Sequence, residues 1–526
     1  MQADVKRGID QSWSASGANV DGSRLVRFLS RLAPGLVFGL GFLAVLCIAL
    51  MIFYFFNHIG FPLNLEMMEG NIFQHFERAA AGLPVYTAPS PEYIPLAYNP
   101  LYYYLAVPFG WVFGVTLPTL RLVAVLGLVG SAGILARLVY IRTNSRWWAL
   151  MAVGLFAAAY RVMDVYLDTA HSDPWLLFSI LLGSYWIDRR SSRIGRLAGV
   201  LMLVAGFWFK QHGALFVAGG VFYLVWREGI RRSWPYWTAA AIFGPALYLW
   251  GGNALFGAYF HYFTWEVPRQ WTQVNVQAVS RYLWFITKSY PALALAAGLL
   301  TAHTVLRRRG ELSVWHVQLV MALASGFLGA LDPGSSNNVF APMGLWFILT
   351  GTLALHSLWL RVGWVQRYGV HLFALVLAFG TLTYFPWRYV VSPSAGDSYA
   401  EFISTLQNLD GPVYAPQLGQ LQDDYKLYPA VGWVALEDII RGPGRSTQNH
   451  PTSRLLLESV IQPDGPAYIV MNYPLETDPL LGFLADYYVR EADWGARFAP
   501  LRALPHRWDL AWPRYLYRYA PDEAAG

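Results

Sequence analysis

Two glutamates, Glu66 and Glu69, stand three residues apart in the segment LEMMEGNIFQHFER, directly after the first long apolar run. Projected as a helix at about 100° per residue, this segment has one apolar face, with Glu69 within it and Glu66 at its edge. A carboxylate partly removed from water becomes a better proton acceptor, so the pair indicates a general base in a cavity. The alternative is an interfacial helix whose glutamate reaches water.

A second group of ionisable side chains lies in the segment YRVMDVYLDTAHSDPWLLF, between two apolar runs. It contains Arg161, Asp168, His171 and Asp173. Because a proline follows Asp173, this aspartate is also typical of a helix N-cap. His171 and Asp173 together could bind a metal ion, but the segment offers no defined third ligand. Catalysis, capping and metal binding therefore stay open at Asp173.

A lysine marks a third segment, FWFKQHGALF, in which Lys210 is followed by Gln211 and His212. Lys210 is the only lysine between Lys6 and Lys288. Lysines at a membrane boundary commonly extend the ammonium toward the headgroup layer, which is the structural alternative. Cations are otherwise sparse on that side of the membrane, so Lys210 suits the binding of an anionic headgroup.

Two later segments carry further polar groups. LDPGSSNNVFAPM supplies Asn337 and Asn338 in a polar turn, which is also typical of an ordinary loop. In YFPWRYV, Arg388 stands among aromatic residues. This setting indicates an interfacial anchor or, alternatively, a contact with phosphate.

The composition shows which elements must position these groups. Of the 526 residues, 56% are hydrophobic and only 13% are charged, whereas about 25% are charged in a typical soluble domain. A helix of about 20 apolar residues spans a bilayer. Apolar runs predict an α-helical polytopic membrane protein with about 11 transmembrane helices, at 33–56, 117–139, 147–160, 175–186, 197–209, 213–226, 239–256, 290–306, 315–331, 339–360 and 370–389.

Arginine-rich segments between these runs predict the orientation. Basic residues cluster in the N-terminal tail, 1–32, and in the loops at 189–196, 227–232, 307–310 and 361–367. By the positive-inside rule these segments are cytoplasmic. Most acidic side chains near the spans then gather on the outer side, which favours a functional site there. This topology accounts for the net charge of +6, so the charge does not indicate a nucleic-acid partner.

Beyond residue 391 the sequence becomes mixed and polar, which predicts a small extracytoplasmic α/β domain over 392–526. The preceding transmembrane domain covers 33–391, with a first outer loop at 57–116. The C-terminal segments with strand or helix patterns are strands at 411–417, 467–473 and 514–520 and helices at 398–409 and 452–461. This region has no phosphate-binding glycine loop and no Ser/His/Asp signature. The single cysteine excludes an internal disulfide.

Several short motifs resemble those of polytopic glycosyltransferases of the C-type fold, the lipid-linked-sugar enzymes related to protein mannosyltransferases and aminoarabinose transferases. The resemblance begins with an acid–glycine start, a Gly-x-Pro-x-Tyr motif and a Tyr-x-Pro motif, formed by Glu69, Gly70, Gly82, Pro84, Tyr86, Tyr98, Asn99 and Pro100. AHSDPWLLF, FKQHGALF and GSSNNVFAPM are similar to later outer segments of the family and follow in the same order. Together these motifs cover most of residues 65–343.

The resemblance implies a reaction in which a sugar leaves a polyprenyl phosphate and joins an outer acceptor with inversion. Glu69 would accept the proton of the acceptor hydroxyl as that hydroxyl attacks the anomeric carbon. Glu66 and Asp173 are the other candidate catalytic carboxylates. In this chain Met68 stands where the family often has aspartate, so the use of a divalent metal is left open.

The resemblance also implies how donor and acceptor are held. The charge that develops on the departing phosphate would be offset by Lys210, with Arg388 and Arg161 as further candidates. The side chains that would orient the acceptor are Asp168, His171, Gln211, His212, Asn337 and Asn338. The acceptor itself, a lipid, a glycan or a protein, is left open.

Two other classes of function remain as alternatives. A polytopic transporter or flippase of a lipid-linked or anionic substrate also places polar groups among membrane helices. Its site is expected near the bilayer midplane, between repeated halves. A non-catalytic assembly subunit is the second alternative, and it is favoured if the outer acids are dispersed. For the enzyme, the expected location is a bacterial inner or plasma membrane, with the N-terminus in the cytoplasm.

Overall fold

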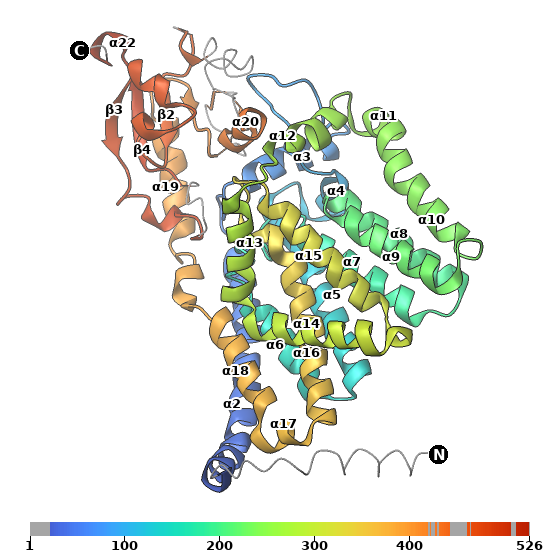
Figure 1. The fold of residues 1–526 in the computed structure, drawn as a ribbon. Coiled ribbons are helices and arrows are strands. Elements are labelled where there is room, and N and C mark those ends of the chain that lie inside the picture. Colours follow the sequence, from blue (N-terminus) through green and yellow to red (C-terminus); the bar gives the residue numbers. More distant parts are fainter. Residues whose placement is uncertain are drawn as a thin grey trace, which may run out of the picture.

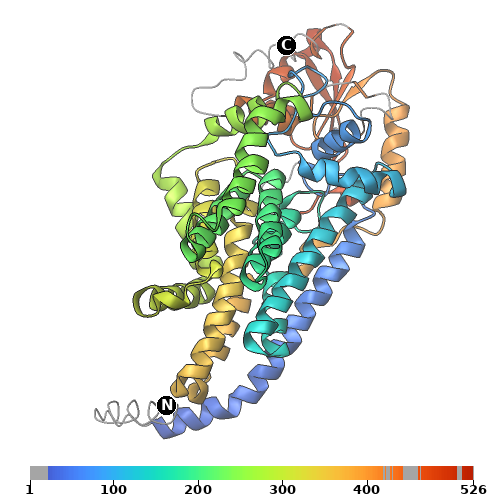
Figure 2. The ribbon, with the colours of Figure 1, turned by 90° about the vertical axis from the view of Figure 1, so that its right-hand side faces the viewer.

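The computed structural model describes residues 22–418, 421, 427–428, 431–441, 460–462, 464–505 and 512–524. Most of this part of the chain is helical, as the composition predicts. The first helix, α2 (Gly22–His58), runs along a bundle of helices from one end toward the other (Figure 2). The bundle contains α5 (Leu117–Thr143), α6 (Arg146–Ala158), α7 (Asp173–Arg189), α8 (Arg193–Phe209), α9 (Gly213–Glu228), α14 (Pro291–Arg307), α15 (Val314–Ala330), α16 (Ala341–Arg361) and α18 (Val370–Leu382).

Each predicted apolar run contains helix, because a chain in lipid must pair its backbone groups internally, although the run at 370–389 is helical only over α18 and η5 (Pro386–Tyr389). The run at 239–256 forms a bent series of α10 (Trp234–Ala241), the π-helix η1 (Ile242–Gly251) and α11 (Gly252–Phe256). In the described part of the chain, the helical stretches that are long and apolar enough to cross a membrane are Leu32–His58, Leu117–Thr143, Trp234–Phe256 and Asn337–Arg361. A pair bent by 99°, α13 (Val276–Ser289) and α14, would add one more. These helices support the prediction that the chain is a membrane protein, whereas the number of spans stays a prediction.

Close helix packing in the bundle depends on small residues. A Cβ atom on Gly183 of α7 would lie 2.7 Å from the carbonyl oxygen of Gly199 on α8, so glycine allows this close approach of the two backbones. Helix α16 packs against α14, α15 and α6, and most of its residues are buried. It therefore forms the centre of the bundle.

Several short elements gather at one end of the bundle. In Figure 1, α3 (Glu69–Ala80), α12 (Val267–Trp271) and α20 (Trp433–Ile440) lie at this end, whereas the start of α2 and α17 (Gly363–Tyr368) lie at the other. Other short elements of the chain are α4 (Leu101–Phe113), η2 (Tyr262–Glu266), η3 (Arg309–Glu311), η4 (Asn337–Phe340) and η5 (Pro386–Tyr389). The end that carries α3, α12 and α20 is called the α20 end below.

The C-terminal part contains a four-stranded sheet of order β1-β2-β4-β3. Strand β1 (Val413–Tyr414) is parallel to β2 (Tyr468–Met471), which is antiparallel to β4 (Tyr515–Tyr519). These strands fall within the three predicted runs, whereas β3 (Tyr488–Asp493), antiparallel to β4, was not predicted. The remaining elements are α19 (Ala395–Gln407), η8 (Leu475–Thr477), η9 (Gly482–Asp486), η10 (Ala499–Leu501) and α22 (Pro521–Ala524). Helix α19 matches the predicted helix at 398–409, whereas 452–459 of the other predicted helix lie outside the described residues.

Candidate active site

A cavity of about 420 Å³ lies at the α20 end of the bundle. Four of the predicted site residues line it, namely Lys210, Gln211, His212 and Asn338. The other polar side chains in its wall are Tyr98, Tyr166, Thr264, Arg269, Thr272, Asp332, Ser335, Ser336, Glu437, Asp438 and Arg441. The cavity therefore brings together segments that are widely separated in the sequence.

Lys210 and Asp173 form a buried ion pair beside this cavity. The Lys210 ammonium donates to both Asp173 carboxylate oxygens, with Nζ–Oδ1 and Nζ–Oδ2 distances of 3.0 Å. Asn338 donates from Nδ2 to Asp173 Oδ2 at 3.2 Å, and His171 Nδ1 pairs with the same oxygen. Three separate sequence segments thus converge on one carboxylate.

The predicted capping role of Asp173 is wrong by one residue. Helix α7 begins at Asp173, its N-cap is Ser172, and neither side chain makes a capping hydrogen bond. The carboxylate of Asp173 is directed instead to the lysine, histidine and asparagine around it. Its contacts are therefore those of a charged site rather than of a helix terminus.

A tight turn between α8 and α9 places Lys210. Its backbone is extended, with φ −156°, and its N–H donates to the Gly206 carbonyl at the end of α8. A Cβ atom on Gly213 would lie 2.4 Å from the Gly206 carbonyl carbon and oxygen, so a larger residue would force the turn apart. Gln211 secures the turn by donating from Nε2 to the Ala97 carbonyl at 2.9 Å and the Thr264 carbonyl at 3.2 Å.

Aromatic rings surround the ion pair. The Lys210 ammonium lies 5.5 Å from the centre of the Tyr98 ring, a distance at which a cation is attracted to the π face. The His171 ring packs edge-on against Tyr98 and Tyr166, with ring centres 5.8 Å and 4.5 Å away. Burial lowers the pKa of His171, which opposes its protonation even though Asp173 favours it. The two tyrosines were not predicted as site residues, although Tyr98 belongs to the Tyr-x-Pro motif.

Glu69, the predicted general base, does not line the cavity. Its side chain is 0% exposed and pairs with Arg121, with Nε–Oε1 at 3.0 Å and Nη2–Oε2 at 2.6 Å. The backbone N–H groups of Leu65 and Ala170 also donate to its carboxylate, each at 2.7 Å. This arrangement ties the start of α3 to α5 and to the segment before α7. The catalytic role of Glu69 stays a prediction.

Glu66 is buried beside this ion pair. Its Oε2 accepts a hydrogen bond of 2.9 Å from the Met68 N–H, whereas Oε1 has no hydrogen-bond partner among the described residues. Burial, with a smaller contribution from the charge of Glu69, raises the pKa of Glu66 well above its ordinary value. Glu66 itself is absent from the cavity wall, although Met67 and Met68 line it.

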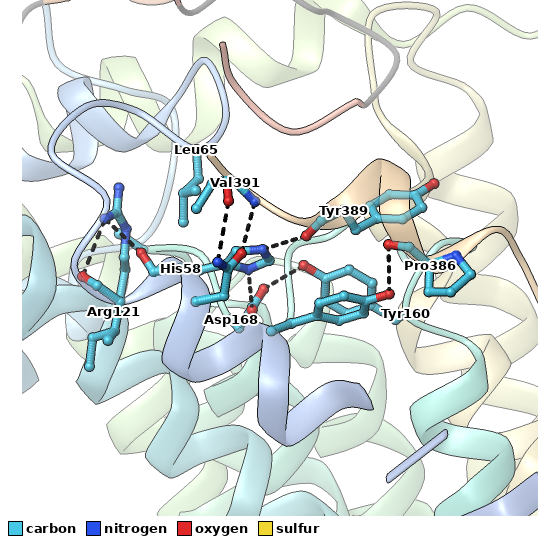
Figure 3. A network of polar contacts seen from close by, with 12 residues as sticks. His58, Leu65, Arg121, Tyr160, Asp168, Pro386, Tyr389 and Val391 are labelled. Carbon is cyan, nitrogen blue, oxygen red and sulfur yellow. Dashed lines mark hydrogen bonds and ion pairs between the residues drawn. The ribbon is translucent and has the colours of Figure 1, made fainter. Parts of the chain in front are cut away.

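Asp168 belongs to a buried network at the end of α2 (Figure 3). Its carboxylate contacts His58 Nδ1 at 2.7 Å and accepts from the Tyr160 hydroxyl at 2.8 Å. His58 Nε2 lies 2.7 Å from the carbonyl oxygen of Tyr389 and must donate to it, because a carbonyl oxygen can only accept. This network joins α2, the segment before α7 and η5, and Asp168 does not line the cavity.

Three other predicted residues are also absent from the cavity wall. Arg161 and Arg388 both act electrostatically on Tyr389 of η5, and Arg388 is exposed. Asn337 donates from its backbone N–H to Asp164 Oδ2 at 3.0 Å. The donor-phosphate and acceptor roles of these residues stay predictions.

Helix α20 supplies a wall of the cavity that was not predicted. Glu437, Asp438 and Arg441 line it from this side, and Asp332 lines it from the turn after α15. The signal of Glu437 and Asp438 in the sequence is WVALEDII, which places two adjacent acids among apolar residues. Arg121 was missed for another reason: it lies inside an apolar run, where an ionisable residue is itself a sign of a partner.

The described residues do not form a metal site. Within the described ranges, no group of three or more His, Cys, Asp or Glu side chains is arranged to hold a metal ion. The carboxylate of Asp173 already contacts a lysine, a histidine and an asparagine.

An apolar groove of about 330 Å³ is lined by residues that lie close in the sequence to residues of the cavity wall. Its walls come from α4, α8, η1 and α11, with Pro100, Leu101 and Trp208 among the lining residues. The cavity is lined by their close neighbours Tyr98 and Lys210, so the same two segments contribute to both spaces. Exposed Leu201 and Phe243 in the groove wall show that the groove reaches the molecular surface.

Comparisons with known proteins identify the fold. No family model and no curated protein matches the sequence. The crystal structures of ArnT from Cupriavidus metallidurans, in the apo state and bound to undecaprenyl phosphate, each superpose with a TM-score of 0.52 at 15% identity, covering 92% of this chain and 98% of ArnT. The Archaeoglobus fulgidus oligosaccharyltransferase, in complex with Zn and sulfate, gives a TM-score of 0.44 at 13% identity over 86% of this chain and 71% of its own. The chain therefore has the C-type glycosyltransferase fold that its short motifs resemble.

Proposed function

We propose that this chain is a membrane glycosyltransferase that moves a sugar from a polyprenyl phosphate to an extracytoplasmic acceptor with inversion. The observation that supports the proposal is that a charged cavity and an apolar groove are lined by neighbouring residues of the same two segments. A polyprenyl-phosphate sugar has the same two parts, a polar anionic head and an apolar tail. The fold shared with ArnT, one structure of which holds undecaprenyl phosphate, supports the same reading.

In this proposal Lys210 binds the donor phosphate. An ammonium has three N–H donors and no acceptor, so its pairing with Asp173 is compatible with a further contact to phosphate. As the bond between the anomeric carbon and the phosphate oxygen breaks, negative charge grows on the departing phosphate. A cation held in a buried position by Asp173 and Tyr98 is fixed in advance to stabilise that charge. Arg269 in the same wall is a second cation for this role.

The proposed topology follows the arginine distribution. Residues 1–32 are cytoplasmic, 33–391 form the transmembrane domain, and 392–526 form the extracytoplasmic domain above the cavity. This places the α20 end on the outer side of a bacterial inner or plasma membrane. The proposal thereby puts donor head, acceptor and C-terminal domain on one face.

A bulky residue in the groove tests this assignment of the lipid tail. Ala205 lines the groove, so Ala205→Trp should exclude part of the prenyl chain. Each buried CH₂ group contributes about 0.8 kcal/mol, and excluding two of them should weaken use of a long-chain donor more than about tenfold. Transfer from a short-chain, water-soluble donor should change much less. The measurement is kcat/KM for both donors in purified protein.

The matched control for this test is Ile194→Trp, which adds the same ring at an exposed position near the start of α8 and outside the groove. Both donors should then be used as by the unmodified chain. Equal losses for long and short donors in Ala205→Trp would contradict a tail in this groove.

A further inference from the structure

Helix α20 is held on two sides, by α12 and by Asp478 in the C-terminal part of the chain. The indole of Trp271 in α12 donates from Nε1 to the Asp438 carbonyl at 2.9 Å. On the other side, Trp433 donates from Nε1 to Asp478 Oδ2 at 2.9 Å. In Figure 1, α20 accordingly lies beside α12, at the same end as the sheet. The side chains that α20 presents to the cavity are therefore fixed in place.

Asp438 is the buried carboxylate in the cavity wall. The residue is 4% exposed, and its Oδ1 accepts a hydrogen bond of 3.0 Å from Arg441 Nη2. Its Oδ2 is buried and accepts no hydrogen bond of good geometry among the described residues, and the backbone N–H of Ala97 interacts only weakly with this carboxylate. A buried carboxylate oxygen without a donor is costly, so it indicates a site for a group that brings an N–H or O–H.

One guanidinium serves three carboxylates here. Arg441 lies 3.6 Å from both Asp332 and Glu437 in addition to its hydrogen bond with Asp438. Its guanidinium also stacks 4.0 Å from the centre of the Trp271 ring. Because three acids share one cation, the local charge favours the uptake of a proton by one of them.

These surroundings make Asp438 a better proton acceptor than an exposed aspartate. Burial raises its pKa to about 8, with Glu437 and Asp332 acting in the same direction, while Arg441 and the Ala97 amide oppose the rise. Tyr98 and Tyr103 are the neutral titratable groups that also interact with it. A general base is most effective when its pKa lies near the working pH.

We propose that Asp438 is the catalytic base that receives the proton of the acceptor hydroxyl. The assignment rests on the proposed function and names the acceptor as a hydroxyl compound bound against α20. The acceptor oxygen forms its bond to the anomeric carbon while the bond from that carbon to the phosphate oxygen breaks. The electron pair leaves with the polyprenyl phosphate, and the acceptor proton moves to the Asp438 carboxylate. Water then takes this proton from Asp438.

The position of Asp438 distinguishes it from the two glutamates of the opening motif. Both oxygens of Glu69 already accept hydrogen bonds from Arg121 and the backbone. Neither Glu69 nor Glu66 lines the cavity, whereas Asp438 does. The C-terminal part of the chain would therefore complete the site instead of only covering it.

The test uses the full chain, purified in detergent, with the polyprenyl-phosphate sugar that supports transfer. Asp438→Asn keeps the shape of the side chain and should lower kcat/KM by about 10²–10⁴-fold. Binding of undecaprenyl phosphate alone should stay within about twofold, because Asp438 serves the acceptor. In the unmodified chain, log(kcat/KM) should rise with pH up to about 8 and then level off, since only the ionised form of Asp438 accepts a proton. This rise should be absent from Asp438→Asn.

Two further variants keep the assignment testable. Glu476→Gln removes an exposed carboxylate, paired with Arg490, outside the cavity, and should leave transfer and its pH profile unchanged. If Asp438→Asn fails to fold, Asp438→Glu keeps the charge, and its pH profile should shift while some activity remains. If the unmodified chain is active and the Asp438 variant keeps full activity with an unaltered pH profile, this assignment alone is wrong. An unmodified chain that transfers no sugar from any donor would overturn the proposed function and this assignment with it.

Discussion

Replacing Arg121 by methionine is expected to destabilise the chain by about 3–5 kcal/mol, because Glu69 would be left as a buried charge without its counterion. The two side chains are 0% exposed. Arg121 also donates to the carbonyl oxygens of Phe61 and Leu63, each at 2.6 Å, and these would lose their donor. The measurement is the midpoint of thermal unfolding of the purified variant, compared with the unmodified chain.

A double variant separates the ion pair from its surroundings. Arg121→Met with Glu69→Gln removes both charges, so it should unfold at a higher temperature than Arg121→Met alone. The same double variant tests the predicted base at Glu69. We expect it to retain transfer once folded, since Asp438 is the proposed base. Complete loss of transfer in a folded double variant would return the catalytic role to Glu69.

A second arginine–carboxylate pair serves as the matched control. Arg142 donates from Nη2 to both oxygens of Asp188, at 2.7 Å and 2.6 Å, and its side chain is 37% exposed. Pairs in contact with water contribute at most about 1 kcal/mol. Arg142→Met should therefore lower the unfolding midpoint much less than Arg121→Met. If Arg142→Met and Arg121→Met lower the unfolding midpoint equally, the buried pair of Arg121 and Glu69 does not stabilise the chain more than an exposed pair.

Replacing Lys210 by methionine is expected to weaken donor binding by about 10–150-fold. Methionine keeps much of the apolar stem but loses a charge-assisted contact with phosphate worth about 1.5–3 kcal/mol. The readout is the Kd for undecaprenyl phosphate, which reports on the donor without requiring an acceptor. Lys210→Arg should recover part of the loss, because it restores the charge with a different geometry.

Replacing Lys210 also affects the stability of the chain, because Lys210 is paired with Asp173. In Lys210→Met the Asp173 carboxylate stays buried without its cation, so the variant also loses stability. Lys210→Met with Asp173→Asn removes both charges and should recover stability while the loss of phosphate binding persists. A folded double variant that binds undecaprenyl phosphate with the affinity of the unmodified chain would remove Lys210 from the donor site.

The helices and their order could be predicted because lipid imposes a strong constraint. A chain in lipid satisfies its backbone groups as helix, so each apolar run contains helix. Run length was a weaker guide, since helices such as α6 and α18 have only 13 residues. The broken helix at α10, η1 and α11 also looked continuous in the sequence, although Pro245 removes a backbone donor there.

The convergence of Lys210, Asp173 and Asn338 could be predicted in outline. All three lie near ends of apolar runs on the predicted outer side, so a shared surface followed from topology. The pairing of individual charges could not be predicted in the same way. Arg121 lies 52 residues from Glu69, and only packing of α5 against α3 brings the two together.

The part of the cavity wall formed by α20 could not be predicted from the sequence for a similar reason. The acids in WVALEDII signal a polar site, but nothing in the sequence indicates that this helix docks on α12. That contact depends on a tryptophan, Trp271, which donates to the backbone of α20 and stacks against Arg441. Such tertiary contacts have no local period that a sequence pattern could reveal.

The central claim, transfer of a sugar from a polyprenyl phosphate, is tested most directly with labelled donors. Membranes containing the chain are incubated with a panel of radiolabelled polyprenyl-phosphate sugars, beside membranes containing folded Lys210→Met/Asp173→Asn. We expect label from at least one donor to move from the lipid to a second molecule, and we expect the double variant to reduce this transfer strongly. Movement of intact labelled lipid across the membrane, with no cleavage of its sugar–phosphate bond for any donor, would contradict this claim.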